Sequence, residues 1–190
     1  MLYRIEPIIN KIMQLQRNNV PVMVGIDGRC AAGKTTLAAD LQKGLDCSVI
    51  HMDDFFLRPE QRTEERYREP GGNIDYERLL QEVLPPLRRG QSFQYRPYDC
   101  KRQELGRPVF VEARPVMILE GTYACHPLFR EQYQLRVFLT LEPEEQLRRI
   151  RERNGAEALE LFRNKWIPLE EHYFSCCQVM EQSDICMQTM

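Results

Sequence analysis

The sequence predicts a single α/β domain over residues 1–190, in which a parallel sheet carries helices on both faces. Short apolar, β-branched runs alternate along the chain with stretches of helical periodicity, an order typical of β-α-β units. The apolar runs contain few polar residues, which indicates strands buried on both faces. No internal repeat, low-complexity tract or linker divides the chain. A length of 190 residues also suits one domain of ordinary size.

The first part of the chain alternates helix and strand twice. Isoleucine and leucine at helical spacing predict a helix over residues 2–17. The run 21–26 lies between a proline and a glycine-containing loop, and it predicts a buried strand. A second helix is expected over 34–45, and the run 47–51 predicts the second strand.

The middle of the chain is less regular. A polar, charge-rich stretch covers residues 58–72. Asp75 is a suitable N-cap for a helix that reaches toward Pro85. Residues 92–111 are expected to form an irregular pair of strands.

The second half returns to the alternating pattern. Further strands are predicted at 115–119, 134–140 and, as a short last one, 184–188. Helical patterns cover 143–153 and 156–174. Pro168 is expected to kink or break the second of these helices.

Composition limits the classes of function. Lys plus Arg number 26 and Asp plus Glu number 28, which gives a net charge of -2. A chain this balanced is expected to bind neither nucleic acid nor a membrane with its whole surface. No apolar run approaches the roughly 20 residues that span a bilayer, and no signal peptide is visible. The 7 cysteines, without a C-x-x-C pair, indicate free thiols and a cytoplasmic location. The oligomeric state stays open.

A glycine-containing segment after the first predicted strand matches G-x-x-x-x-G-K-[ST]. Gly28 and Gly33 let the backbone curl so that successive N–H groups point at phosphate oxygens. Lys34 supplies positive charge between the terminal phosphates, and the hydroxyl of Thr35 is a ligand for Mg²⁺. The predicted nucleotide-binding residues are Gly28, Arg29, Cys30, Ala31, Ala32, Gly33, Lys34, Thr35 and Thr36.

Acidic residues follow two of the later predicted strands. Asp53 and Asp54 come after the second strand, and Glu120 follows the third. Because ligands of an open α/β sheet bind at the carboxyl ends of its strands, each acid could stand beside the triphosphate. Asp53 is placed to accept a proton from an attacking hydroxyl or to hold Mg²⁺ through water. The predicted metal site therefore comprises Thr35, Asp53 and Glu120, whereas Asp54 is equally consistent with a turn cap.

Arginines are concentrated in one predicted helix, at 148, 149, 151 and 153. Arg149 and Arg153 share one face of this helix, and Arg148 and Arg151 share another. Such a run is usually a solvated face neutralised by nearby glutamates. Phosphoryl transfer, however, requires cations that neutralise the moving group, which favours a lid role for at least one pair. The candidate catalytic residues are Lys34, Asp53, Arg149 and Arg153.

With these motifs the sequence resembles the uridine kinase and nicotinamide riboside kinase branch of the P-loop kinases. The resemblance rests on segments 25–36, 49–56, 73–76, 98–99 and 118–121 and on the arginine helix. The phosphate loop is shared by many ATPases, whereas the D-D-F-F segment from Asp53 is much more selective. The resemblance implies a three-layer P-loop NTPase fold with a five-stranded parallel sheet and a small helical lid over about 143–174. It also implies transfer of the ATP γ-phosphoryl group to a ribose 5′-hydroxyl.

The same resemblance implies roles for individual residues. Asp53 corresponds to the catalytic acid that faces the hydroxyl, Asp75 to the acid that holds the ribose hydroxyls, and Glu120 to the acid near Mg²⁺. The implied substrate-binding residues are Asp53, Asp75, Tyr98 and Asp99. Where uridine kinases usually carry a histidine that contacts the pyrimidine, this sequence has Gln103. The identity of the acceptor is therefore open.

The alternatives differ in acceptor or in class. The same chemistry could act on nicotinamide riboside, pantothenate or a sugar phosphate, and a sugar phosphate would use extra cations such as Arg62, Arg66 and Arg68. These arginines could equally lie in a solvated loop. A GTPase-type switch is not supported, because no D-x-x-G follows the loop and 164–167 lacks the final Asp of N-K-x-D. The intact loop and strand-tip acids argue against a module that binds nucleotide without catalysis.

Overall fold

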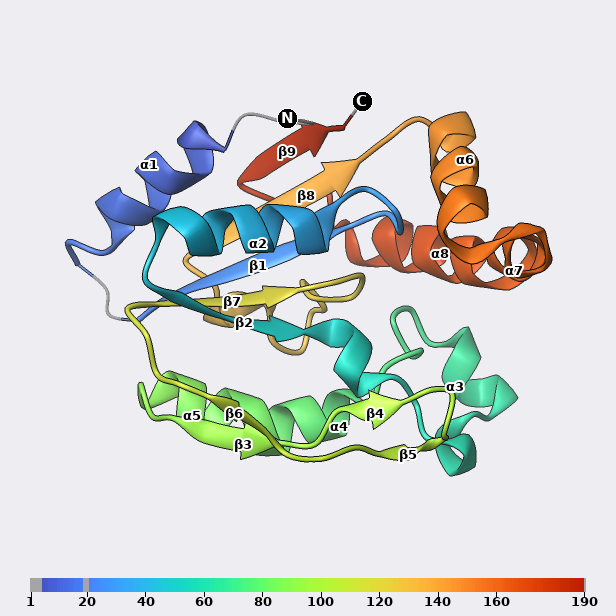
Figure 1. The fold of residues 1–190 in the computed structure, drawn as a ribbon, viewed down its shortest axis with the longest axis horizontal. Helices are drawn as coiled ribbons and strands as arrows, with labels where there is room; N and C mark the ends of the chain where they lie inside the picture. Colours follow the sequence, from blue (N-terminus) through green and yellow to red (C-terminus); the bar gives the residue numbers. More distant parts are fainter. Residues whose placement is uncertain (1–4, 19–20, 190) are drawn as a thin grey trace.

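The fold is built on a five-stranded parallel sheet, seen in a computed structural model that describes residues 5–18 and 21–189. The strands are β1 (Val22–Gly28), β2 (Cys47–His51), β7 (Val116–Glu120), β8 (Leu135–Thr140) and β9 (Ile185–Gln188). Their order is β2-β7-β1-β8-β9, and all four pairings are parallel (Figure 1). The predicted α/β class with a five-stranded parallel sheet is confirmed.

Two helices cover one face of the sheet, namely α1 (Glu6–Leu15) and α2 (Lys34–Gly44). Val22, Val24 and Ile26 alternate along β1 and belong to the buried cluster on this side. Ile8 and Ile12 of α1 are fully buried in the same cluster. The isoleucine spacing that predicted an amphipathic helix therefore describes its packing face.

A second cluster of larger side chains fills the other face. It contains Met23, Met117 and Phe138 from the sheet strands. The helical elements that contribute to it are α4 (Tyr76–Arg78), a π-helical turn (Leu79–Val83), α5 (Leu84–Arg88) and α8 (Ile167–Cys177). Phe174 of α8 meets Phe138 edge to face, with ring centroids 5.1 Å apart. Apolar cores on both faces make the protein three-layered, as predicted.

The first helix is shorter than the prediction over 2–17. In the described residues it covers Glu6–Leu15, and residues 2–4 lie outside the described part of the chain. Pro7 fits the first turn, because the N–H groups there have no helical partner.

Of the two helix interruptions expected at prolines, the structure confirms the one at Pro168 but not the one near Pro85. The helical run that was expected to end near Pro85 continues to Arg88. Pro168 lies in the first turn of α8, directly after the π-helical turn Phe162–Trp166. Each proline therefore takes a position where an α-helical N–H is dispensable, and the extra residue of the π-helical turn absorbs the mismatch.

The chain between β2 and β7 forms a smaller region beside the second core (Figure 1). Its elements are two 3₁₀ turns (Met52–Phe55 and Pro59–Gln61), α3 (Glu64–Arg68), β3 (Phe93–Tyr95), β4 (Tyr98–Asp99), β5 (Glu104–Leu105) and β6 (Val109–Val111). β3 pairs with β6 and β4 with β5, both antiparallel. This arrangement matches the irregular strand pair predicted over 92–111.

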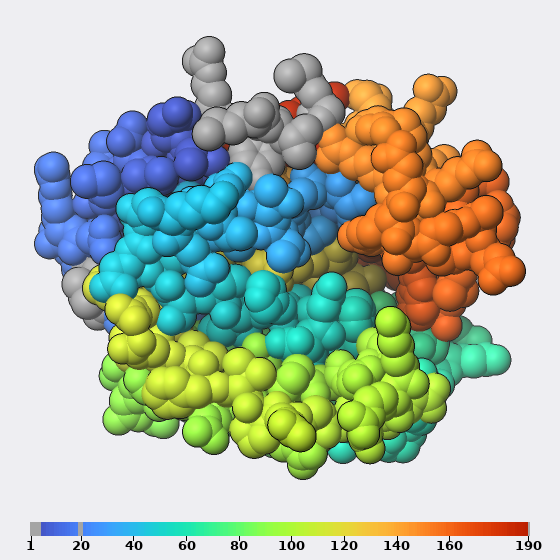
Figure 2. Space-filling view, viewed as in Figure 1, coloured from blue at the N-terminus to red at the C-terminus, as the bar shows by residue number. Residues whose placement is uncertain are grey.

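Helices gather at the carboxyl end of the sheet, where α6 (Pro143–Asn154) and α7 (Ala156–Leu161) precede α8 (Figure 1). A last 3₁₀ turn covers Arg130–Gln132. In Figure 2 the atoms of α6 and α7 form an orange bulge beside the sheet. Within residues 5–18 and 21–189, no helix is long and apolar enough to cross a membrane.

Gly28, the last residue of β1, is required by close packing as well as by its backbone. Its φ is +135°, and a Cβ there would lie 2.0 Å from the carbonyl oxygen of Leu139. Gly155 also has a positive φ, of +87°, but a Cβ there would meet nothing within 4 Å. We expect Gly28→Ala to lower the free energy of unfolding by about 3 kcal/mol or more, and Gly155→Ala by about 1–2 kcal/mol. Urea denaturation measures both, and equal losses would contradict the steric argument.

Candidate active site

The phosphate-binding loop has the conformation that its glycines predict. It leaves β1 at Gly28 and enters α2 at Lys34, with left-handed backbone at Ala31 (φ 62°) and Gly33 (φ 94°). The buried ammonium of Lys34 donates to the carbonyl oxygens of Gly28 at 2.7 Å and Arg29 at 2.9 Å. These bonds hold the positive charge against the loop, where the N-terminus of α2 adds its dipole.

A large cavity of about 1700 Å³ opens over this loop. Of the predicted nucleotide-binding residues, those that line it are Cys30, Ala31, Gly33, Lys34, Thr35 and Thr36. Asp53, Glu120, Arg149 and Arg153 line the same cavity. Gly28, Arg29 and Ala32 do not line it; they shape the loop from behind. The loop, both strand-tip acids and three lid arginines, Arg148, Arg149 and Arg153, therefore share one space.

Glu120 stands at the end of β7 and is buried, with 3% of its surface exposed. Its Oε1 accepts a hydrogen bond from the Thr35 hydroxyl at 3.1 Å and lies 2.6 Å from Nδ1 of His51. That hydrogen bond to Glu120 is the main reason why the pKa of His51 is raised, and burial acts against it. Because β2 and β7 are neighbours in register, His51 lies directly opposite Glu120. His51 was not predicted as a site residue, although its position at the end of a predicted strand is visible in the sequence.

The Thr35–Glu120 pair fits a magnesium ion bound mainly by phosphate oxygens and water, the usual arrangement for Mg²⁺ beside a nucleotide. Within the described ranges, no group of three or more His, Cys, Asp or Glu side chains could hold a metal by itself. A cation at this place would therefore depend on the nucleotide for most of its ligands.

Asp53 lies in the 3₁₀ turn after β2, with its side chain in the cavity. Burial raises the pKa of Asp53, the positive charge of Lys34 opposes this, and the negative charge of Glu120 adds to it. Arg153 also acts to lower the pKa of Asp53. Asp53 is thus close enough to the loop lysine, to the second acid and to one lid arginine to be coupled to each.

The arginines of α6 differ in how they are held. Arg149 bonds Glu145 at 2.6 Å and the carbonyl oxygen of Ala31 at 3.2 Å, so it ties α6 to the phosphate-binding loop. Arg148 is paired with Glu145 and Glu152. Arg153 bonds only the side chain of Asn154 and, among described residues, has no carboxylate partner.

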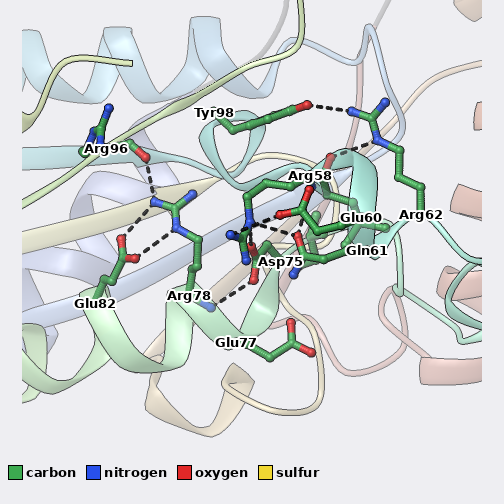
Figure 3. Close-up of polar contacts among 12 residues, drawn as sticks. Arg58, Glu60, Gln61, Arg62, Asp75, Glu77, Arg78, Glu82, Arg96 and Tyr98 are labelled. Carbon is green, nitrogen blue, oxygen red and sulfur yellow. Dashed lines mark hydrogen bonds and ion pairs between the residues drawn. The ribbon is translucent and has the colours of Figure 1, made fainter. Parts of the chain in front are cut away.

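The acceptor residues implied by the resemblance lie outside the cavity wall. Asp75 is buried, accepts a hydrogen bond from the backbone N–H of Arg78 at 3.2 Å, and lies 3.3 Å from Nε of Arg58 (Figure 3). Asp75 thus caps α4 as predicted. Tyr98 is buried, and its hydroxyl accepts a hydrogen bond from Arg62 at 3.0 Å. Asp99 accepts bonds from the backbone N–H groups of 101 and 102. Substrate binding by Asp75, Tyr98 and Asp99 stays a prediction.

Two buried acids behind the loop were missed. Asp27 accepts from the N–H groups of Gly28 at 2.6 Å and Cys125 at 2.8 Å and from the hydroxyl of Tyr173 at 2.8 Å. Burial raises the pKa of Asp27. An acid inside the apolar strand β1 was a signal that the sequence offered. Glu170, a cavity residue of α8, accepts from the N–H of Cys30 at 2.9 Å, and no local sequence signal marks it.

Glu170→Gln is expected to flatten the dependence of stability on pH. Burial raises the pKa of Glu170 to about 7 from the ordinary 4.5. The folded protein therefore keeps a proton that the unfolded chain loses in this window, so stability falls as the pH rises from about 4.5 to 7. Between about pH 5 and 8 we expect the wild type to lose on the order of 2–3 kcal/mol relative to the variant. Urea denaturation of the wild type and the variant at about pH 5 and about pH 8 measures this difference in the free energy of unfolding.

Glu171→Gln is the matched control, since its carboxylate is partly exposed and paired with Arg29 at 2.7 Å. An unchanged pH dependence in Glu170→Gln would contradict the assignment of this titration.

Comparison with known proteins places the chain among kinases, although no family model matches it. It is 33% identical over 139 residues to nicotinamide riboside kinase 2 of Mus musculus, covering 70% of this chain and 68% of that protein. It is 29% identical over 129 residues to the uridine kinase of Clostridium perfringens, covering 63% of this chain. The chain spans only 61% of the length of that uridine kinase.

A solved structure of a possible uridine kinase from Bacillus stearothermophilus superposes with a TM-score of 0.68. The match covers 95% of this chain and 99% of the other at 20% identity, so it supports the fold alone. The likeness to the mouse kinase reaches 33% identity and covers more than two thirds of both chains. The chain therefore belongs to the uridine kinase and nicotinamide riboside kinase family of P-loop kinases.

Proposed function

We propose that this protein is an ATP-dependent kinase that transfers the γ-phosphoryl group to a hydroxyl of a small, nucleoside-like acceptor. One observation carries the proposal: the loop lysine Lys34 and the acids Asp53 and Glu120, each from a different element, line one cavity. A phosphate cradle alone would serve any nucleotide-binding protein. An acid beside it in the same cavity gives an incoming hydroxyl a place to leave its proton.

Each charged residue of the cavity has a separate role in the proposed phosphoryl transfer. The acceptor oxygen attacks the γ-phosphorus, the bond between that phosphorus and the β,γ-bridging oxygen breaks, and ADP leaves with the bond electrons. Asp53 accepts the hydroxyl proton, for which its raised pKa suits it. Lys34 and Arg153 neutralise charge on the transferred group. Thr35 and Glu120 would hold Mg²⁺, and the ion would neutralise further phosphate charge.

The segment 143–174 is the proposed lid over the nucleotide. Arg149 already contacts the loop at Ala31 and could hold α6 in place, while Arg153 has no competing carboxylate among the described residues. The 7 free cysteines support a reducing, cytoplasmic location.

The test is a phosphorylation screen with Mg·ATP over nucleosides, nicotinamide riboside, pantothenate and pentose phosphates. Mass spectrometry should find one acceptor class that gains a phosphoryl group, with ADP formed in equal amount. If the wild type phosphorylates no hydroxyl compound although calorimetry shows that it binds ATP, the proposal fails in favour of a nucleotide-binding module.

A further inference from the structure

Besides Lys34 and Arg153, two further cations on the cavity wall have no acidic partner among the described residues. Arg62 donates Nε to the carbonyl oxygen of Leu57 and Nη2 to the hydroxyl of Tyr98, both at 3.0 Å. Its Nη1 forms no hydrogen bond with residues 5–18 or 21–189. Lys165 lies over the rings of Tyr67 at 4.3 Å and Trp166 at 4.6 Å. In the same described ranges neither cation forms an ion pair with a carboxylate, although both line the cavity.

Arg62 and Lys165 line the same cavity as Asp53. Arg62 lowers and Asp53 raises the pKa of Cys100, so the cysteine, another cavity residue, is near both. Arg62 also acts to lower the pKa of Tyr67, whose ring carries Lys165 on its face. Tyr67 thus lies near both cations, and Cys100 lies near both Arg62 and Asp53.

Arg66 and Arg68 follow Arg62 in the segment 62–68, called the flap here. Both are already engaged in other contacts. Arg66 is bonded to both carboxylate oxygens of Glu77 at 2.7 Å and to the carbonyl oxygens of 72 and 74. Arg68 is exposed, pairs with Glu64 and does not line the cavity. Figure 3 shows Arg62 bonded to Tyr98, apart from the cluster that Arg58 forms with Asp75. Of the three flap arginines, only Arg62 faces the cavity.

We infer that the acceptor is an anionic alcohol whose phosphate or carboxylate group binds between Arg62 and Lys165 while its hydroxyl faces Asp53. This inference rests on the proposed transfer of a phosphoryl group from ATP to a hydroxyl, and it replaces the neutral nucleoside as acceptor by an anionic alcohol. An anion would supply both cations with a counter-charge and accept charge-assisted hydrogen bonds from them. Such bonds are stronger than neutral ones. A positively charged acceptor such as nicotinamide riboside would meet like charge in the same place. A neutral nucleoside would leave both cations without a counter-charge.

The experiment compares acceptors that differ only in charge. Ribose is paired with ribose 5-phosphate, and glycerol with both glycerol 3-phosphate and D-glycerate; uridine and nicotinamide riboside represent neutral and cationic nucleosides. We expect phosphorylation of an anionic probe, with kcat/KM at least about tenfold above its neutral partner. Preference for a phosphate or for D-glycerate identifies which anion the site takes.

Variants of the two cations test where the anionic group of the acceptor binds. Arg62→Gln and Lys165→Gln are each expected to raise the acceptor KM about tenfold while the KM for ATP stays within about twofold. Arg68→Gln, in the same flap, and Arg163→Gln, in the same π-helical turn and paired with Glu160, are matched controls that should leave both constants unchanged.

Calorimetry with ribose 5-phosphate and D-glycerate in the presence of ADP answers the same question without turnover. Weaker binding in both variants supports the inference. It is overturned if uridine or nicotinamide riboside is phosphorylated and the anionic probes neither react nor bind, or if a rise in the KM for ATP alone shows that the cations serve the nucleotide. In each of these cases the kinase proposal stands, since it fails only when no acceptor is phosphorylated at all.

Discussion

Replacing Lys34 with methionine is expected to lower kcat/KM for phosphoryl transfer by about 10²–10³-fold, the effect of removing a charge that acts on the transition state. The apolar stem of the side chain is kept, so the buried site beside α2 stays filled. The ammonium that bonds the carbonyl oxygens of Gly28 and Arg29 is lost, and with it the charge nearest the terminal phosphates.

A coupled assay of ADP release measures this change, and calorimetry with ATP reports binding separately. Lys43→Met on the same helix is the matched control, because Lys43 is exposed and pairs only with Asp40. Loss in Lys34→Met with full activity in Lys43→Met supports the role of the loop lysine. Full activity in Lys34→Met would contradict a role of the phosphate-binding loop in the reaction.

Asp53→Asn is expected to reduce kcat by about 10²–10⁴-fold with a small change in the KM for ATP. Asparagine is nearly the same size but cannot accept the hydroxyl proton. Because burial raises the pKa of Asp53, the wild-type activity should fall on the acid side at a pH above the ordinary 3.8 of an aspartate. This acid limb should be absent from the residual activity of the variant.

The neighbouring Asp54→Asn provides the control. Asp54 accepts a hydrogen bond from the hydroxyl of Tyr95 at 2.5 Å, which an amide oxygen can also accept, and it does not line the cavity. We expect its turnover to stay within a few-fold of the wild type. A comparable loss in both variants would assign Asp53 a structural role.

The sheet and the phosphate-binding loop could be predicted because their signals are local. A strand buried on both faces is a continuous apolar run, as in 22–26, and the loop needs glycine at the two positions where the backbone turns. Glu120 could be predicted for a related reason. The carboxyl ends of parallel strands meet at one edge, so an acid at the end of β7 must lie near the loop after β1.

The acceptor side could not be predicted in the same way, because its contacts join residues far apart in the chain. No sequence feature near Lys165 predicts that Tyr67 lies beneath its ammonium, and none near Arg58 predicts its contact with Asp75. The composition of 58–72 suggested three equivalent arginines, whereas tertiary contacts use Arg66 for structure and leave only Arg62 in the cavity. The helix end expected near Pro85 was wrong, because a π-helical turn before Leu84 lets the helical run continue past that proline.

A crystal structure with Mg²⁺ and a non-hydrolysable ATP analogue tests the central claim most directly. The account predicts the β- and γ-phosphates on the backbone N–H groups of 31–35, the ammonium of Lys34 between them, and the carboxylates of Asp53 and Glu120 at the γ-phosphate end. A nucleotide whose γ-phosphate points away from Asp53, or that binds outside the loop, would contradict it.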